Sequence, residues 1–324
     1  MISQQVPLST PFSAASTAAD VVAGVDLAGR EVIITGGHGR LGREVTRALA
    51  GAGANVTIAA RDTERAATAV EGIDGVRVEA LDLTDPTSID AFAQRWLDSG
   101  RPLHILVNSA AVLFGPLRRD TRGHELQFST SHLGHFQLTR ALLPALRAAG
   151  GARVVTVTSG AARFGSIRWD DLDFATGYEP ATAYGQSKRA NVLFTVELDR
   201  LYADEGIRAF TTHPGVIIGP GPHSAERIPS YRAQGLVDEN GDTIIDPAGG
   251  KKTIEQGAAT IVFGAVSPLL DGIGGVYLKD NEVSVLDDVD RPLTAESIPS
   301  EANSAMLNPE DARRLWGISQ KLTS

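Results

Sequence analysis

The stretch Glu31-Val-Ile-Ile-Thr-Gly-Gly-His-Gly-Arg-Leu-Gly42 decides the fold of this chain. Its first five residues form a short, mostly β-branched run, which is typical of a buried parallel strand. The glycines Gly36, Gly39 and Gly42 follow with the spacing G-x-x-G-x-x-G, and residues 41–50 continue with helical spacing. Such a loop lets a pyrophosphate approach the backbone at the start of a helix, so the stretch predicts a dinucleotide-binding loop. A glycine triplet alone is weak evidence, and the alternative is a glycine-rich turn that binds nothing. The position of this triplet in the first strand–helix–strand unit favours the dinucleotide loop.

Strand-like and helix-like segments alternate along most of the chain. A helix is expected at 63–70, and further strands are expected at 55–60, 76–83, 104–108, 153–158, 208–213 and 275–278. Strands that alternate with helices form a parallel sheet covered on both faces. We therefore expect an α/β fold, a single Rossmann-type doubly wound parallel sheet with helices on both faces, in a domain that spans 27–324.

Two segments fall outside this alternation. Residues 1–26 are expected to be an N-terminal leader, loose over 1–15, with a short helix after Thr17. Residues 218–252 are rich in Gly, Pro and Asp, with a helical piece at 224–236. A long irregular stretch inside a compact domain is usually a binding lid or is disordered, and the helical piece favours a C-terminal substrate lid.

Composition excludes several classes of protein and site. The 324 residues include 30 Lys+Arg and 39 Asp+Glu, so the formal net charge is −9, which disfavours nucleic-acid binding. Cysteine is absent, which excludes disulfides and thiolate metal sites. No apolar run approaches the ~20 residues of a membrane span, and no secretory signal is evident, so we expect a cytoplasmic protein.

The residues at the end of the 55–60 strand determine which nicotinamide cofactor is expected. An acidic residue there would bind the ribose 2′-hydroxyl of NAD, whereas this chain has Arg61. Arg61 is expected to pair with a 2′-phosphate, and Arg40 of the glycine loop to approach the same phosphate. NADP is therefore predicted, with NAD less favoured. The neighbouring Asp62 weakens the case, and the alternative is that both arginines are solvated surface side chains.

A tyrosine, a lysine and a serine form the candidate catalytic set. Tyr184 and Lys188 are four residues apart, so they share one face of a helix. A phenol has a pKa of ~10, and a nearby ammonium would lower that pKa toward neutrality. Ser159 follows a predicted strand, where its hydroxyl could hold a substrate oxygen. A Tyr–Lys pair alone would be read as a solvated helix pair.

Read together and in order, these motifs resemble the short-chain dehydrogenase/reductase family over about residues 27–286. Within it the chain is most similar to the retinol-dehydrogenase-like branch. The stretches that carry the resemblance are Asp82-Leu83, Asn108-Ser-Ala-Ala111, His132-Leu-Gly-His-Phe136, Ala183-Tyr-Gly-Gln-Ser-Lys-Arg-Ala-Asn191, His213-Pro-Gly-Val, Glu255-Gln-Gly-Ala-Ala-Thr260 and Arg314-Leu-Trp316.

The resemblance implies a role for each matching residue. Tyr184 would exchange the proton, Lys188 would lower its pKa and bind the nicotinamide ribose, and Ser159 would hold the reacting oxygen. Ser131 aligns with the helix asparagine of the family's proton relay and completes the catalytic set. The predicted cofactor-binding residues are Gly36, Gly39, Arg40, Leu41, Gly42, Arg61, Asp82, Leu83, Asn108, Ala110, Tyr184, Lys188, Pro214, Gly215 and Ile217.

Three positions depart from the family pattern. Ser131 replaces the asparagine, Ala111 replaces a glycine near the cofactor, and Gly219 aligns with the Thr or Ser that contacts the carboxamide. The glycine spacing of the loop is that of the extended branch of the family. These changes leave Tyr184, Lys188 and Ser159 in place, but they bear on turnover and on nicotinamide orientation.

The function expected is NADP-dependent interconversion of a carbonyl and an alcohol by hydride transfer, with Tyr184 as general acid/base and a hydrophobic substrate. The alternatives are an NADP(H)-binding sensor or scaffold without redox turnover, and non-redox acid/base chemistry on the same fold. No metal is expected, because His132 and His135 lack a third ligand and are better explained by packing. The expected partners are a small-molecule substrate and, as an open alternative, further copies of the chain in a homo-oligomer.

Overall fold

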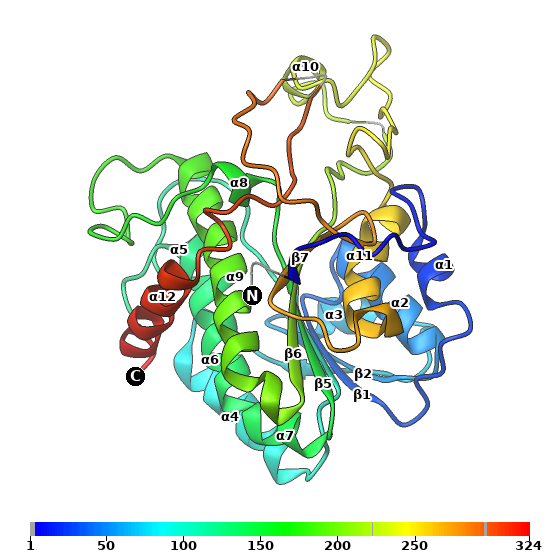
Figure 1. The fold of residues 1–324 in the computed structure, drawn as a ribbon, viewed down its shortest axis with the longest axis vertical. Coiled ribbons are helices and arrows are strands. Elements are labelled where there is room, and N and C mark those ends of the chain that lie inside the picture. The colour runs from blue at the N-terminus through cyan, green and yellow to red at the C-terminus, as the bar shows by residue number, and fades with distance from the viewer. Residues whose placement is uncertain (1–3, 222, 295–296) are drawn as a thin grey trace.

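A single eight-stranded sheet forms the centre of the molecule (Figure 1). The computed structural model describes residues 4–221, 223–294 and 297–324. The strand order is β3-β2-β1-β4-β5-β6-β7-β8, and neighbouring strands run parallel except β7 and β8. The strands are β1 (Glu31–Thr35), β2 (Asn55–Ala60), β3 (Val76–Ala80), β4 (Ile105–Asn108), β5 (Ala152–Val157), β6 (Ile207–His213), β7 (Val276–Lys279) and β8 (Glu282–Val283).

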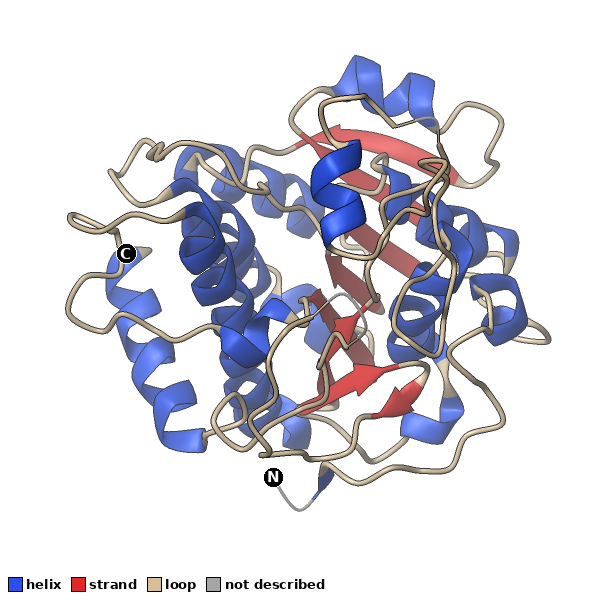
Figure 2. Ribbon diagram, turned by 90° about the horizontal axis from the view of Figure 1, so that it is seen from above, coloured by secondary structure: helices blue, strands red, loops and turns tan. Residues whose placement is uncertain are grey.

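Helices cover both faces of this sheet, and Figure 2 shows the strands as a central layer between them. The α-helices are α1 (Ala18–Val22), α2 (Arg40–Gly51), α3 (Thr63–Ala69), α4 (Pro86–Asp98), α5 (Leu126–Phe128), α6 (Gly134–Ala141), α7 (Leu143–Ala148), α8 (Ala161–Phe164), α9 (Pro180–Tyr202), α10 (Ile228–Ala233), α11 (Ile254–Val266) and α12 (Pro309–Leu322). A π-helical turn, η2 (Ser129–Leu133), precedes α6, and short 3₁₀ turns form η3 (Ala203–Glu205) and η4 (Pro268–Leu270). The predicted doubly wound architecture is confirmed.

Alternate residues of the buried strands face opposite layers of the core. In β1, Val32 and Ile34 pack into the cluster that includes α1, α2 and α11, whereas Ile33 packs into the cluster of α4, α6 and α9. All three side chains are fully buried, which explains why the strand reads as an uninterrupted apolar run.

The strand order reverses between β1 and β4, which lie side by side and lead into connections on opposite sides. In open α/β sheets the carboxyl ends of the strands at such a switch point border the ligand crevice. The glycine loop after β1 and the segment 109–111 after β4 therefore lie at the expected binding edge.

The edge at β7 and β8 differs from the sequence-based expectation of an all-parallel sheet. Strand β8 pairs antiparallel with β7. The two residues that connect them, Asp280 and Asn281, have φ of 55° and 62°. Positive φ at both central positions is typical of a type I′ hairpin turn, and Asp and Asn tolerate it. The Asp-Asn pair was the sequence signal for this hairpin.

The N-terminal segment is tied to this hairpin, so the expectation of a loose leader is wrong for residues 4–15. The Gln5 side chain donates to the carbonyls of Tyr277 (2.9 Å) and Ser284 (2.7 Å). The amides of Leu8 and Thr10 donate to the Glu282 carboxylate at 2.7 and 2.8 Å. Residues 1–3 lie outside the described residues. The domain boundary near residue 27 stays a prediction.

Most other predicted elements are confirmed, with ends that shift by one to four residues. The short helix after Thr17 is α1, and a capping box joins Thr17 to Asp20. The third strand ends at Ala80 rather than at residue 83, and the helical piece expected at 224–236 is limited to α10. Over the described ranges, no helix combines the length and apolar character needed to cross a bilayer.

Candidate active site

The glycine loop forms a cradle between β1 and α2. Gly36 has φ of 66°, and a Cβ there would lie 3.1 Å from Ala110 Cα. A Cβ on Gly42 would collide with the carbonyl oxygen of Gly36. The loop needs glycine at both positions, the first for its backbone angle and the second for close packing. The twelve-residue helix α2 begins directly behind it, with Gly39 as N-cap, so its first N–H groups can bind an anion.

The loop after β4 is tied to the end of β1 through one hydroxyl. Thr35 Oγ1 accepts hydrogen bonds from the amides of Ser109 (2.9 Å) and Ala110 (3.1 Å). Asn108 is buried, and its Nδ2 donates to Thr139 Oγ1 at 3.2 Å. The predicted residues Asn108 and Ala110 are thus brought beside the glycine cradle.

The tip of β2 and the loop after β3 carry the predicted adenosine-side residues. Arg61 is exposed directly after β2, and Asp62 caps α3 by accepting from the Arg65 amide at 3.0 Å. Asp62 is thus used as a helix cap. Asp82 Oδ1 accepts from the amide and hydroxyl of Thr84 at 2.9 and 2.7 Å, so its carboxylate also shapes a turn.

Two further predicted residues serve packing around the loops. Leu83 is buried, and its carbonyl lies so close to Gly134 that a Cβ there would collide with it. Leu41, in the first turn of α2, is partly buried and packs against the α1–α2–α11 core.

Arg40 lies elsewhere than the sequence suggested. It was expected to share a 2′-phosphate with Arg61, but Arg40 Nη1 donates to the carbonyl of Ile218 at 3.0 Å. The guanidinium therefore points to the base of the 218–252 segment. This contact could not be read from the sequence, because 178 residues separate the two partners.

Tyr184, Lys188 and Ser159 come together at the carboxyl ends of β4 and β5. Helix α9 carries Tyr184 and Lys188 on one face, and Lys188 Nζ lies 5.6 Å from the centroid of the Tyr184 ring. Ser159 follows β5 and hydrogen-bonds with Tyr184. Three residues from two distant stretches thus meet at one point, as expected.

The pKa values of this group differ from the sequence-based expectation. Burial raises the pKa of the Tyr184 phenol, and the hydrogen bond with Ser159 only opposes that rise. Burial also lowers the pKa of Lys188 to about 8. The predicted lowering of the tyrosine pKa is therefore wrong for this structure, because burial is the largest cause of the shift and Lys188 is not among the groups that lower it. A role of the ammonium toward the phenolate stays a prediction for the reacting, cofactor-bound state.

Ser131 lies in the π-helical turn η2, which packs against α9. It is fully buried, and within the described residues its hydroxyl has no hydrogen-bond partner. Its carbonyl accepts a hydrogen bond from His135 Nδ1 at 3.0 Å. Single π turns inside helices are frequent at functional sites.

His135 connects the η2 turn to Thr35, directly before the glycine loop. Nothing in the sequence indicated this role for His135. His135 Nε2 lies 2.8 Å from Thr35 Oγ1. The Ser131 carbonyl can only accept, so His135 Nδ1 carries the ring proton and Nε2 of the neutral ring is an acceptor. The Thr35 hydroxyl can then donate to Nε2, which is closer than its other acceptor, the Val107 carbonyl at 3.4 Å. His132 instead packs among Phe128, Phe136 and Phe194, as expected. No cluster of three metal-ligating side chains occurs in the part of the chain that the structure describes.

His213 holds the turn that carries Ser159. Its Nδ1 accepts a hydrogen bond from the amide of Gly160 at 3.1 Å, and its ring stacks on Tyr277. The motif His213-Pro-Gly was noticed in the sequence, but only its proline and glycine were given a role. The contact explains why a buried imidazole ends β6.

The pH dependence of the free energy of unfolding tests this arrangement, because three of its histidines are buried. Burial lowers the pKa of His132 and His213 to about 3 and that of His135 to about 4. The unfolded chain takes up these protons near pH 6.5, so the free energy of unfolding should fall as pH drops below 6.5. Each histidine adds about 1.4 kcal/mol per pH unit to this slope.

Denaturant unfolding between pH 7 and 4.5 measures this slope. His213→Asn should flatten it by one histidine's share, because an amide oxygen can still accept from Gly160. His223→Asn, in the half-exposed part of the 218–252 segment, is the matched control. An unchanged slope in His213→Asn would contradict the assignment.

The residues after His213 form the base of the 218–252 segment. Gly215 has φ of 84° and lies against the Lys252 stem, and Ile217 packs so closely on Gly257 of α11 that a Cβ there would collide. Lys252 is fully buried and pairs with Asp280 at 2.5 Å. A parallel β-bridge between Val216 and Lys251 holds the two ends of the 218–252 segment together.

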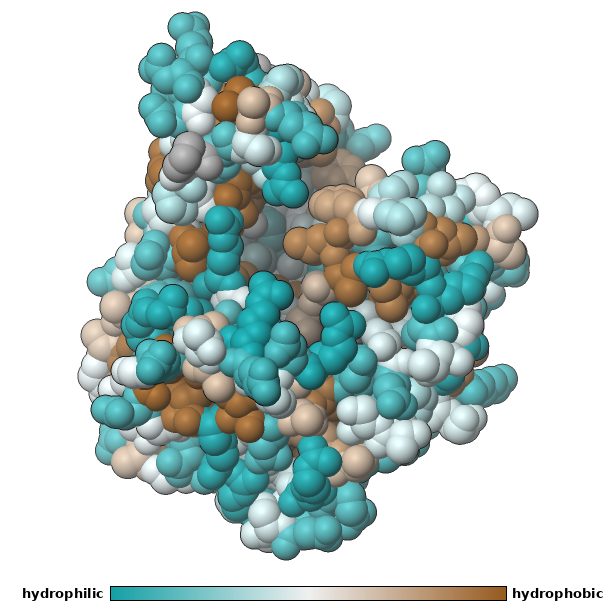
Figure 3. Space-filling model, turned by 180° about the vertical axis from the view of Figure 1, so that it is seen from behind, coloured by the Kyte–Doolittle hydropathy of each residue, from teal (hydrophilic) through white to brown (hydrophobic). Residues whose placement is uncertain are grey.

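Apolar side chains rim the site. The centroids of the Phe114 and Tyr184 rings are 5.0 Å apart. Phe114 has a φ of 52°, a strained backbone angle for a bulky residue. Viewed from behind, the surface is hollowed between two lobes, with hydrophobic side chains on both sides (Figure 3). Large apolar side chains are exposed in the loop after β4, at Leu113 (60%), Phe114 (51%) and Leu117 (37%), and at the end of α8, at Phe164 (48%).

Comparison with known proteins shows the family of the chain. The family model of the short chain dehydrogenases matches residues 30–223. A "Probable oxidoreductase" of Streptomyces lividans is 43% identical over 300 residues, which cover 90% of this chain and 97% of that protein. Retinol dehydrogenase 12 of Mus musculus is 36% identical over 92% of this chain and 87% of its own length. Polyprenol dehydrogenase of Mus musculus is 34% identical over 91% and 84%.

Solved structures share the fold. An uncharacterized protein from Mycobacterium Paratuberculosis superposes with a TM-score of 0.70 at 31% identity, over 95% of this chain and 97% of that chain. The Pseudomonas aeruginosa RhlG/NADP active-site complex has a TM-score of 0.57 at 24% identity, over 78% and 95%. With the family model matched over more than half of its length, the chain belongs to the short-chain dehydrogenase family of oxidoreductases.

Proposed function

We propose that the protein is an NADP-dependent oxidoreductase that interconverts a carbonyl compound and an alcohol, with a hydrophobic substrate. The observation that carries this proposal is the meeting of the Tyr184 phenol, the Ser159 hydroxyl and the Lys188 ammonium at the carboxyl end of β5. Phenol and ammonium supply acid/base chemistry, and the hydroxyl can hold an oxygen that gains negative charge.

The cradle suits a dinucleotide. Its glycines let the loop pack tightly against itself and against Ala110 and carry no side chain that would keep a pyrophosphate away from the backbone, and the start of α2 offers N–H groups to that anion. When bound, the nicotinamide supplies or accepts the hydride. Asp82, Leu83, Asn108 and Ala110 would border the adenosine half and the centre of the cofactor, and Pro214, Gly215 and Ile217 would border its nicotinamide end.

The protein side chains would then manage the proton and the orientation of the substrate. The raised pKa of Tyr184 keeps the phenol protonated at neutral pH, so it can donate to the carbonyl oxygen during reduction. Ser159 would hold that oxygen, and Lys188 would bind the ribose and stabilise the phenolate that forms. The buried Ser131 hydroxyl, which has no hydrogen-bond partner among the described residues, would be available to pass a proton onward.

A hydrophobic substrate is favoured by the apolar rim. Phe114 lies against the Tyr184 ring, Leu113 and Leu117 expose large apolar side chains in the same loop, and Phe164 exposes one at the end of α8, which follows Ser159. Exposed apolar side chains of this kind favour an apolar ligand. The names of two relatives, retinol dehydrogenase 12 and polyprenol dehydrogenase, also refer to apolar alcohols. A cytoplasmic location and assembly into a homo-oligomer stay predictions.

The direct test is NADPH consumption with a panel of carbonyl compounds of increasing apolar length, together with NADPH titration. Redox turnover that increases with apolar length supports the proposal. Binding without consumption across the panel would instead favour a sensor or scaffold. Product formation without net NADPH oxidation would identify non-redox chemistry.

Cofactor choice should depend on Arg61. A guanidinium–phosphate pair contributes about 1.5–3 kcal/mol, so Arg61→Asp should weaken NADPH binding by about 10- to 100-fold. The new carboxylate should also improve NADH binding, because it can accept from the ribose 2′-hydroxyl. Dissociation constants for both cofactors measure the change, with Arg65→Asp as control. Equal NADPH affinity in Arg61→Asp and the unaltered protein would refute this role.

A further inference from the structure

We propose that Arg40 couples the bound pyrophosphate to the position of the 218–252 segment, which acts as a lid, so that cofactor binding fixes this lid. The inference rests on the proposed function and adds a positioning residue to it. Arg40 is the first residue of α2, where the pyrophosphate would bind. Its guanidinium is also hydrogen-bonded to the Ile218 carbonyl at 3.0 Å.

Arg40 and Gly219 fit each other closely. A Cβ on Gly219 would lie 2.6 Å from Arg40 Nη1 and 3.0 Å from Cζ. Gly219 also has φ of 76°, an angle that glycine adopts without strain. The residue after Ile218 therefore leaves open the space that the guanidinium occupies.

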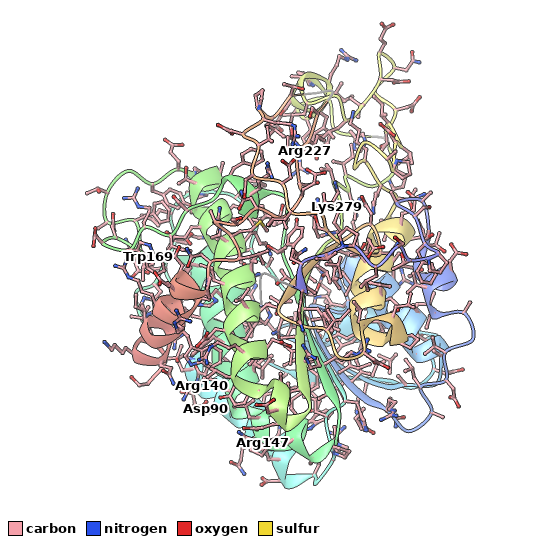
Figure 4. All side chains as sticks on the ribbon, viewed as in Figure 1. Asp90, Arg140, Arg147, Trp169, Arg227 and Lys279 are labelled. Atoms are coloured by element: carbon pink, nitrogen blue, oxygen red, sulfur yellow. The ribbon has the colours of Figure 1, made fainter. Side chains whose placement is uncertain are left out.

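The contact between Arg40 and residues 218–219 lies at a point from which hydrogen bonds extend into the rest of the 218–252 segment. The carbonyl of Gly219 accepts from Thr243 Oγ1 at 2.8 Å, and Thr243 also contacts His223 Nε2 at 2.8 Å. Residues 218–219 therefore connect Arg40 to the two parts of the lid that contain His223 and Thr243. Figure 4 shows Arg227, on the same lid, well above the sheet.

The positive charge of the Arg40 guanidinium makes its contact with Ile218 depend on whether the cofactor is bound. A guanidinium has five N–H donors, and one of them is used on Ile218. An anion at the start of α2 would take others and so hold the exposed Arg40 side chain in one position. Because such coupling is reciprocal, a fixed lid would strengthen cofactor binding by the same factor.

Limited proteolysis tests this coupling without relying on turnover. Trypsin can cleave the lid after the exposed Arg227 or Arg232. Saturating NADPH should slow this cleavage by about tenfold in the unaltered protein, the size of one charge-assisted hydrogen bond. In Arg40→Met, which keeps the apolar stem, the same NADPH saturation should slow cleavage less than about twofold. Arg43→Met, an exposed arginine on the same helix, is the matched control.

A second pair of variants tests the Arg40–Gly219 contact itself. Gly219→Ala should remove the NADPH protection, because its Cβ displaces the guanidinium. Combined with Arg40→Met it should cause little further loss, since the backbone strain is the same in both backgrounds. Additive losses of protection would overturn the contact.

The outcomes separate this inference from the proposed function. If Arg40→Met binds NADPH and is protected as well as the unaltered protein, the coupling is wrong and the proposed function stands. The same conclusion follows if the unaltered protein binds NADPH without protection of the lid. If the unaltered protein binds neither NADPH nor NADH, both proposals fail.

Discussion

Tyr184→Phe is expected to lower kcat for carbonyl reduction by at least about 10³-fold, while the dissociation constant for NADPH changes less than about threefold. Positioned acid catalysis contributes about 10²–10⁴ to a rate, and this substitution removes the proton that would be transferred. The ring itself stays, so its contact with Phe114 at 5.0 Å is preserved. Single-turnover NADPH oxidation and fluorescence titration measure the two quantities.

A matched variant distinguishes loss of the proton from loss of structure. Tyr178→Phe removes a hydroxyl that donates to the Gly115 carbonyl at 3.0 Å on the neighbouring loop, outside the catalytic set. It should retain most activity. Normal reduction of the preferred substrate by Tyr184→Phe would reject the tyrosine as the proton donor and, with it, the proposed mechanism.

Lys188→Met should be inactive and yet more stable than the unaltered protein at pH 7. Burial lowers the pKa of Lys188 to about 8 from 10.5, so keeping the ammonium charged in the fold costs up to about 3 kcal/mol. Methionine has a similar length and no charge. The Val157 carbonyl that accepts from Lys188 Nζ at 3.2 Å also accepts from Asn191 at 3.1 Å, so it keeps a partner. We expect a gain of about 1–3 kcal/mol in the free energy of unfolding.

The pH dependence gives this prediction a sign that can be checked. Between about pH 8 and 10.5 the unfolded chain holds the Lys188 proton and the folded chain releases it, so the stability of the unaltered protein gains from rising pH. The advantage of Lys188→Met should therefore shrink across this range. Denaturant unfolding at pH 7 and 9.5 measures it, with the exposed Lys321→Met as control. Destabilisation by Lys188→Met at pH 7 would contradict the assigned cost of burial.

Features that depend on neighbouring residues were predictable from the sequence. The apolar run of β1, the glycine spacing after it and the Tyr184–Lys188 interval each reflect local geometry. For the same reason the Asp280-Asn281 hairpin could have been found, because its turn angles depend on the two residues that form it.

Features that depend on burial or on distant contacts could not be predicted in this way. The sequence suggested that Lys188 lowers the pKa of Tyr184, but the burial that reverses the outcome comes from the packing of α9 against the sheet. His213 appeared as part of a motif, yet its bond to Gly160 joins residues 53 apart. The tied leader segment likewise depends on Glu282, more than 270 residues away.

The amino-acid order alone thus determined the α/β class and the position of the glycine loop, because strand and helix periodicity and glycine backbone freedom are local properties. The three catalytic candidates came from the order of several motifs along the chain and from the family resemblance that this order carries. Tertiary structure alone decided the direction of the pKa shifts, the bridge from Ser131 through His135 to Thr35, and the reach of Arg40 to the lid. Desolvation and long-range hydrogen bonds exist only once distant segments pack together, and no local pattern encodes them.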